Sequence, residues 1–279
     1  MKPIVFCAAL LANSGAVAAQ IEYLGSYVWT EPGIGGLSGV EVLSETEMTA
    51  LSDRGTLVTI TTERTDAGQI DAITGFDSVL LSPDAGPFDS EGLAIDPAGG
   101  IWLSFEGPAR ISKVSNSGEF LDTLPPAPSF SGMQTNAALE ALAIDAAGNI
   151  LTLAERSGRA DRPYQMLRHS KDGWSVAFTM DRVGAFLPVG ADFGPDGLLY
   201  LLERDSLGLW FRSRIRRMAP DGSKVETIFQ SGFGDFDNLE GISVWSPSKS
   251  DGGIRITLVS DNNFLSVQET QFVDFKLTD

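Results

Sequence analysis

The sequence contains almost none of the residues that bind transition metals or form covalent cross-links. Of 279 residues, one is a cysteine, Cys7, and one is a histidine, His169. Cys7 falls in an N-terminal segment that we expect to be removed, so the mature chain is left without disulfides or cysteine ligands. This composition disfavours a zinc, copper or iron site. Because His169 precedes an expected surface turn, the composition also disfavours a Ser-His-Asp hydrolase.

Long apolar runs are missing as well. The apolar stretch 4–12 follows Lys2 and precedes small residues at 16–19, a pattern typical of a cleaved signal peptide. It is shorter than the roughly 18 to 20 residues that span a bilayer, and no later segment approaches that length. We therefore expect a signal peptide over 1–19, a single domain over 20–279 without a membrane span, and a periplasmic or secreted location.

Basic residues are scarce relative to acidic ones. The chain carries 20 lysines and arginines against 37 aspartates and glutamates, a formal net charge of −17. A charge of this sign argues against binding nucleic acid through bulk electrostatics. Cations are the better-matched partners, although acidity can also serve only to keep an exported protein soluble.

The most informative feature present is an internal repeat of about 50 residues. Each unit opens with an acid or small residue beside Gly or Ala, continues through an apolar run and a turn, and closes with a second apolar run that ends in an acid. The turns are rich in Asp, Gly, Asn and Pro, and the runs are short, as expected for strands rather than helices. The five copies open at Leu37, Ser90, Leu139, Val189 and Leu239.

This repeat predicts an all-β fold, a β-propeller with one four-stranded blade per unit. The count gives five blades, or six if the segment 156–181 contains an additional unit. The last unit has only three apparent strands, so we expect the N-terminal run Ile21–Trp29 to supply the fourth. A ring closed by strands from both termini would leave few exposed edges.

Equivalent positions of successive blades meet around the central channel, so the acids of the repeat are predicted to lie together. We call the position at the start of the first run the opening position and the position at the end of the second run the closing position. Three units carry a glutamate at the opening position and the other two carry Ser38 and Gly190; the glutamates are Glu91, Glu140 and Glu240. All five units are predicted to carry an acid at the closing position: Asp53, Glu106, Glu155, Glu203 and Asp261.

Carboxylates gathered in a channel repel one another unless a cation, a base or bound protons compensate them. Calcium fits best, because it takes several hard oxygen ligands without strict geometry. We predict that Glu91, Glu140 and Glu240 are catalytic. The predicted calcium ligands are Asp53, Glu91, Glu106, Glu140, Glu155, Glu203, Glu240 and Asp261. The structural alternative is that each acid caps a strand by accepting backbone hydrogen bonds and pairs with an arginine.

Three closing acids are followed directly by an arginine: Arg54, Arg156 and Arg204. A planar guanidinium group holds a carboxylate or phosphate through two hydrogen bonds. We predict that these three arginines orient an anionic group of a substrate. Ordinary surface pairing is the alternative.

The ordered set of these motifs resembles the phytase-like family, described as having esterase-like activity of phytase. The resemblance covers about 33–275 and depends on segments 36–39 and 51–55, 90–93, 202–204, 238–241 and 260–264. It implies an exported bacterial propeller that uses calcium and hydrolyses phosphoesters or other esters. The longer Asp-rich, Lys-containing segments of a true phytase site are absent from this sequence, which argues against phytate specificity.

The leading hypothesis is therefore a monomeric, calcium-assisted hydrolase that acts on a small-molecule ester or phosphoester in an acidic channel. The rival is a non-catalytic binding or scaffolding propeller in which calcium is structural. A third reading is a glycosidase that uses two of the carboxylates. That reading requires an aromatic-lined cleft, for which Trp102, Trp210 and Trp245 are candidates.

Overall fold

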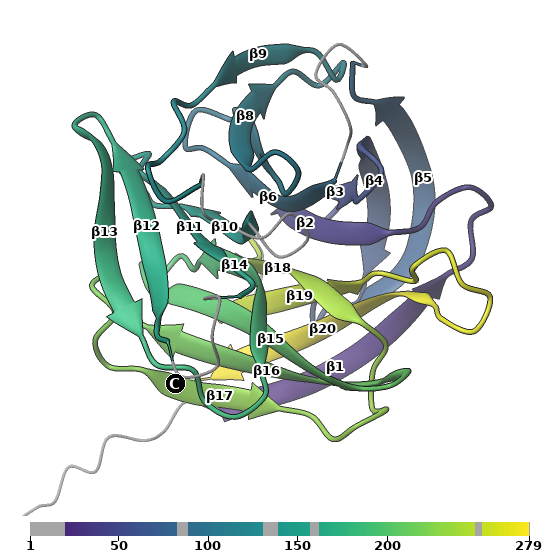
Figure 1. The fold of residues 1–279 in the computed structure, drawn as a ribbon. Coiled ribbons are helices and arrows are strands. Elements are labelled where there is room, and N and C mark those ends of the chain that lie inside the picture. The colour runs from purple at the N-terminus through teal and green to yellow at the C-terminus, as the bar shows by residue number, and fades with distance from the viewer. Residues whose placement is uncertain (1–19, 83–88, 131–138, 157–161, 249–252, 279) are drawn as a thin grey trace, which may run out of the picture.

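The computed structural model describes residues 20–82, 89–130, 139–156, 162–248 and 253–278, and these form an all-β structure. Five four-stranded antiparallel sheets are arranged as blades around a common axis (Figure 1). The predicted signal peptide, 1–19, lies outside the described residues. In the ranges given above, no helix has the length and apolarity to cross a membrane.

The strands follow the chain from blade to blade, and the first strand of each blade is the innermost one. Blade 1 contains β2 (Leu37–Ser44), β3 (Glu47–Ser52), β4 (Thr56–Arg64) and β5 (Ile70–Leu80). Blade 2 contains β6 (Ser90–Ile95), β7 (Ile101–Phe105), β8 (Arg110–Val114) and β9 (Phe120–Thr123). Blade 3 contains β10 (Leu139–Ile144), β11 (Ile150–Ala154), β12 (Tyr164–Ser170) and β13 (Gly173–Met180). Blade 4 contains β14 (Leu187–Phe193), β15 (Leu199–Leu207), β16 (Trp210–Met218) and β17 (Glu226–Gln230).

Blade 5 is built from both ends of the chain. It contains β18 (Leu239–Trp245), β19 (Ile254–Ser260), β20 (Thr270–Thr278) and the N-terminal strand β1 (Gln20–Trp29). β1 pairs antiparallel with β20 from Gln20 opposite Thr278 to Trp29 opposite Thr270, and the two strands lie side by side in Figure 1. This arrangement confirms the predicted five blades and their closure. Segment 156–181, where a sixth blade was considered, instead contributes β12 and β13 to blade 3.

The hydrophobic core is divided into five clusters, each between two neighbouring blades. The cluster between blades 4 and 5 includes Tyr200, Leu202, Ile242 and Phe275, none more than 3% exposed. Burying one such side chain contributes about 2 kcal/mol. Every cluster needs two blades, and the one between blades 5 and 1 is complete only when the ring closes.

Small residues let the innermost strands approach one another at the axis. A Cβ atom on Gly190 would lie 2.4 Å from the Glu240 carbonyl oxygen, and one on Gly241 would lie 3.0 Å from the Gly39 backbone. Such distances leave no room for a larger side chain. The Gly or Ala beside each opening position is therefore required by this packing, and it marks the equivalent site in every blade.

Candidate functional site

The opening residues are bulged out of their strands. In blade 3, Leu139 pairs with Ala154 and Ala141 pairs with Leu153, so Glu140 is an extra residue without a partner. In blade 5, Leu239 pairs with Ser260 and Gly241 with Val259, which leaves Glu240 in the same situation. Bulges of this kind redirect a side chain and are common beside functional sites. Here the bulges remove the opening residues from the regular alternation of side chains between the two faces of the strand.

Blade 4 differs by one residue from the register predicted from its sequence. Pro188 pairs with Glu203 and Gly190 with Leu202, so the bulged opening residue is Val189 rather than Gly190. The closing residue is correspondingly Arg204 rather than Glu203. The physical reason is the close packing at the axis, which requires Gly190 where the other blades have Gly39, Gly92, Ala141 and Gly241. An arginine thus takes the place that an acid holds in the other four blades.

Glu203 is placed away from the other predicted acids. Its side chain is fully buried in an ion-pair triad in which Arg214 Nε donates to Oε2 at 2.7 Å and Arg216 Nη2 donates to Oε1 at 2.6 Å. Arg216 also reaches Met180 Sδ in blade 3, at 3.2 Å. Both carboxylate oxygens of Glu203 thus accept from arginines of its own blade, and Arg216 makes the contact with blade 3.

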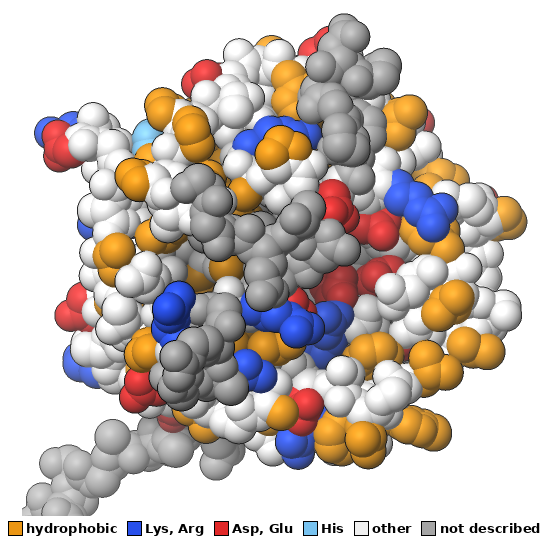
Figure 2. All heavy atoms as spheres, in the orientation of Figure 1, with side chains coloured by type: hydrophobic (Ala, Val, Ile, Leu, Met, Phe, Trp, Pro, Cys, Tyr) orange, Lys and Arg blue, Asp and Glu red, His pale blue; other side chains and the backbone are white. Residues whose placement is uncertain are grey.

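The other predicted acids gather at one end of the channel. With one unpredicted neighbour they form what we call the acid cluster: Asp53, Asp89, Glu91, Glu106, Glu140, Glu155, Glu240 and Asp261. Figure 2 shows acidic side chains near the centre of this face. Asp89 was missed because it precedes the aligned part of its repeat. Its position immediately before the Ser90-Glu91-Gly92 motif is the signal that could have revealed it.

Arg204 supplies a positive charge inside the acid cluster. Its Nη1 donates to Asn238 Oδ1 at 2.7 Å and makes a close ion pair with Glu240 Oε1, while Nη2 lies 3.4 Å from Glu155 Oε1. Asn238 Nδ2 also donates to Glu240 Oε1, at 3.0 Å. Glu240 is therefore held on two sides. Asn238, only 2% exposed, is a positioning residue that the repeat did not identify.

The other two predicted arginines lie at the rim of the cluster and are exposed. The Arg54 guanidinium lies over the Phe264 ring, 3.5 Å from its centroid. Arg156 pairs with its neighbour Glu155, with Nε 3.2 Å from Oε2. Of the three predicted arginines, the structure brings only Arg204 into the cluster.

Burial and mutual repulsion raise the pKa values of several cluster carboxyls. For Glu91, burial raises the pKa well above its usual range, and the charges of Glu240 and Glu106 raise it further. For Glu140 the causes are burial, then the charge of Glu91 and a hydrogen bond with Glu106. Burial, followed by the charge of Glu240, raises the pKa of Asp261 to about 7. Near neutral pH such a cluster retains protons or attracts a cation.

Three of these carboxylates converge closely enough to share a metal ion. Asp89, Glu91 and Glu106 each offer an oxygen, and these oxygens all lie within 4.8 Å of one another. The backbone fixes the arrangement, because Glu106 N donates to Asp89 O at 2.9 Å and Ser90 N donates to Asp53 O at 3.1 Å. Carboxylate oxygens without histidine or cysteine suit calcium, so the donor set fits the predicted ion.

A separate pair of acids consists of Glu41 on β2 and Asp192 on β14. Both lie on the innermost strands, further along the strand than the opening position. Asp192 accepts hydrogen bonds from Val244 N at 2.6 Å and Phe193 N at 2.7 Å. Burial raises the pKa of Asp192 to about 7, while burial and then the charge of Asp192 raise that of Glu41 well above its usual range. Ser243 Oγ contacts Glu41 Oε2 at 3.4 Å, so this pair joins blades 1, 4 and 5.

The three tryptophans named for an aromatic-lined cleft and the histidine each lie in a different environment. Trp245 is buried and donates from Nε1 to Thr257 Oγ1, whereas Trp102 donates to Asp96. Trp210 is 62% exposed. His169 lies on β12 and packs against Trp174.

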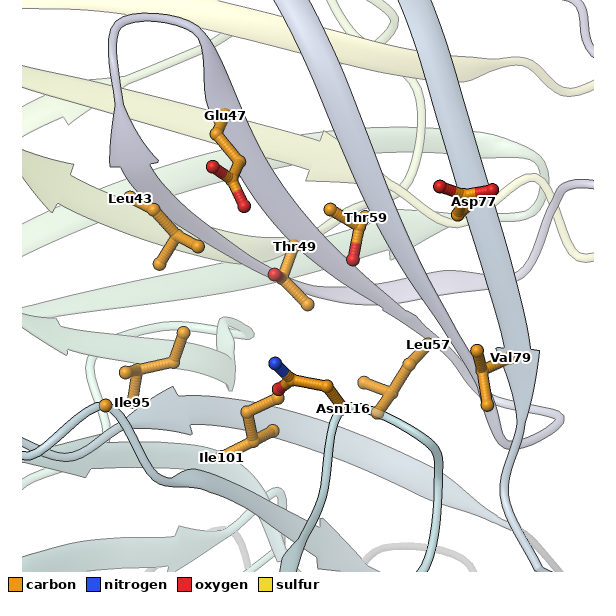
Figure 3. Close-up of a pocket in the computed structure, with 11 residues that line it drawn as sticks. Leu43, Glu47, Thr49, Leu57, Thr59, Asp77, Val79, Ile95, Ile101 and Asn116 are labelled. Atoms are coloured by element: carbon orange, nitrogen blue, oxygen red, sulfur yellow. The ribbon is translucent and has the colours of Figure 1, made fainter.

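A hollow lies between blades 1 and 2 (Figure 3), and its lining includes Thr49, Leu57 and Ile101. None of the predicted site residues lines it.

Comparison with known proteins gives a family and a fold. Residues 32–264 match the family described as "Phytase-like: Esterase-like activity of phytase". No curated protein sequence matches. Among solved structures, the PQQ-bound aldose sugar dehydrogenase from Streptomyces coelicolor is 12% identical with a TM-score of 0.53, covering 93% of this chain and 98% of that one. The calcium-binding protein regucalcin from Agrobacterium tumefaciens is 14% identical with a TM-score of 0.50, covering 87% and 77%. At these identities the solved structures support the propeller fold alone.

Proposed function

The chain belongs to the phytase-like family, and on that premise we propose that it is an exported hydrolase that uses calcium at the acid cluster to cleave an ester. The observation that carries the proposal is the convergence of Asp89, Glu91 and Glu106 within a larger group of carboxylates. A group of this kind is costly to keep ionised without a cation. Residues with perturbed pKa values in a channel are also candidates for catalysis.

The charge of the cluster favours an uncharged ester over a phosphoester. Among the described residues, eight carboxyl groups surround one arginine, Arg204, whereas Arg54 and Arg156 lie at the exposed rim. With calcium bound by three of these groups, a phosphate group would still be repelled by the carboxylates that the ion does not compensate. An uncharged carboxylic ester meets no such barrier. The proposed substrate is therefore a small carboxylic ester rather than phytate.

The residues divide into those that would hold the ion and those that would act on the ester. Asp89, Glu91 and Glu106 would bind calcium, which when bound polarises the ester carbonyl and lowers the pKa of water. Glu240, held by Arg204 and Asn238, would accept a proton from the attacking water. Its net pKa is raised, chiefly by burial, which brings its basicity closer to neutral pH. Glu140, whose pKa is raised further, would return a proton to the leaving group.

The test is hydrolysis of p-nitrophenyl acetate, p-nitrophenyl phosphate and phytate by the purified mature protein, in calcium and then in chelator. The expected result is turnover of the acetate in calcium, loss of that turnover in chelator, and little turnover of either phosphate. Preferred turnover of p-nitrophenyl phosphate would overturn the choice of bond. Equal acetate turnover in calcium and chelator would overturn the role of the ion.

The rival, a non-catalytic propeller with structural calcium, also has an observation in its favour. Arg204 ties Glu155 of blade 3 to Glu240 of blade 5, so part of the cluster already serves to join blades. The rival predicts a calcium-dependent rise in melting temperature without turnover of any ester. Recording melting curves in the same two buffers distinguishes the two functions.

A further inference from the structure

A groove lies beside the acid cluster, between the β15–β16 hairpin and the loops that precede β18 and β20. Its volume is about 300 Å³, and its walls include Leu209, Trp210, Phe236 and Val267. These segments all adjoin the ends of blades 4 and 5 that carry Arg204, Glu240 and Asp261. On the face drawn in Figure 2, hydrophobic side chains gather beside the acidic centre. The groove therefore opens on the same face as the cluster.

One side of the groove is formed by exposed apolar side chains, whereas much of the remaining lining is polar. Leu209 is 64% exposed, Trp210 62% and Val267 72%. Large apolar side chains gathered in one exposed place mark binding surfaces more often than single ones do. The wall is also fixed in position. The Trp210 ring packs on Gly234, where an added Cβ would lie 2.6 Å from it, and Gly234 N donates to Phe211 O at 2.8 Å.

The groove meets the acid cluster through two residues. Phe211 lines the groove, and its ring centroid lies 5.9 Å from the Arg204 guanidinium carbon. Asp237 also lines it and directly precedes Asn238, which accepts a hydrogen bond from Arg204 Nη1 at 2.7 Å. A molecule whose reacting bond lies at the cluster can thus extend over Phe211 into the groove.

The charge of the lining indicates what kind of group fits. Among the described residues that line the groove there is no lysine or arginine, while Asp235, Asp237 and Glu269 are acidic. An anionic group would be repelled, and a strongly polar one would find apolar walls on one side. We propose that the groove binds the uncharged alkyl chain of the substrate's acyl group. This inference rests on the proposed ester hydrolase and assigns its substrate class as apolar acyl esters.

The test compares p-nitrophenyl acetate, butyrate and hexanoate in calcium. A methylene group half removed from water in an open groove gains roughly a twofold preference, so kcat/KM should rise about sixteenfold over the four added methylene groups from acetate to hexanoate. Trp210→Ala and Val267→Asp should reduce the ratio of kcat/KM for hexanoate to that for acetate to about two or less. Leu121→Ala, which changes an equally exposed leucine on β9 of blade 2, should leave both activity and ratio unchanged. A wild-type ratio near one, or a ratio retained in both groove variants, would overturn the proposal.

A binding measurement separates failure of the groove from failure of the enzyme. Hexyl p-nitrophenyl ether has no ester bond, and its nitrophenyl group should quench Trp210 fluorescence when bound. Val267→Asp keeps Trp210, so loss of quenching in this variant reports lost binding. If the wild type shows quenching, Val267→Asp abolishes it, and no ester is cleaved, then the groove binds alkyl chains but the protein is not an ester hydrolase. Absence of quenching in the wild type would reject the groove whatever the turnover.

Discussion

Replacing Arg204 by methionine removes the positive charge from the acid cluster while keeping an apolar stem of similar length. Glu240 and Glu155 then lose the ion pair that they share, and both side chains are about a tenth exposed or less, at 11% and 8%. Breaking a buried ion pair from one side costs roughly 3 to 5 kcal/mol. Because Arg204 itself is 17% exposed, water screens part of the ion-pair interaction. We therefore expect the free energy of unfolding to fall by about 3 kcal/mol at pH 8 in chelator.

The loss of unfolding free energy in Arg204→Met should be smaller at low pH and smaller in calcium. At pH 5 the carboxyls with raised pKa values, Glu91, Glu140 and Asp261, already bind protons in the folded state, so less negative charge remains for Arg204 to compensate. We therefore expect the loss to fall to about 1 kcal/mol at pH 5. Saturating calcium at pH 8 should also reduce it, because the ion supplies the missing positive charge.

The assay is urea unfolding followed by circular dichroism, at pH 5 and pH 8, in chelator and in calcium. Arg156→Met is the matched control, because Arg156 is 56% exposed and pairs with a member of the same cluster. Its loss should be below about 0.5 kcal/mol in every buffer. An equal loss for Arg204→Met in all four buffers would contradict a charge-compensating role for Arg204, since a packing defect alone does not depend on charge.

Two further predictions concern the acids outside the cluster. Asp192 has a folded-state pKa of about 7 against an ordinary value of 3.8, so the folded protein binds more protons than the unfolded one. The free energy of unfolding should therefore fall between about pH 4 and pH 7, by about 1.4 kcal/mol per pH unit. Asp192→Asn should flatten that slope in pH-dependent urea unfolding; an unchanged slope would remove Asp192 as its source. Glu203→Gln should lower the free energy of unfolding by about 3 kcal/mol, because Arg214 and Arg216 lose their buried counter-charge. Calorimetry should find its calcium affinity unchanged, and a weakened affinity without destabilisation would instead identify Glu203 as a ligand.

Much of the fold could be predicted because the repeat is regular. Short apolar runs separated by Asp- and Gly-rich turns specify strands locally, and a spacing of about 50 residues specifies four strands per blade. The closure of the ring followed from counting strands in the last unit, and β1 pairs with β20 as expected. The strands and the number of blades depend on local sequence, and the closure follows from the strand missing in the last unit, which is why the sequence was sufficient.

The composition of the site was less predictable because a one-residue shift in register changes which side chains meet. Glu203 and Arg204 are adjacent, so an acid or an arginine could equally be assigned to the closing position of blade 4. The packing requirement at Gly190 decides between them, and aligning Gly190 with Gly39 and Gly241 would have given the observed register. Asn238 and Asp89 lie outside the aligned runs, and their roles depend on contacts between distant segments.

Paired measurements of calcium affinity and ester turnover on one variant decide whether the acid cluster is a calcium-dependent hydrolase site. Glu91→Gln removes one of the three converging carboxylates, and Glu119→Gln, an exposed residue in the β8–β9 turn, is the matched control. Isothermal titration calorimetry gives the calcium Kd, and p-nitrophenyl acetate hydrolysis gives the calcium concentration at half-maximal rate. Both values should rise together by about tenfold or more in Glu91→Gln and stay unchanged in Glu119→Gln. Wild-type values of both quantities in Glu91→Gln would contradict a calcium-dependent hydrolase centred on this cluster.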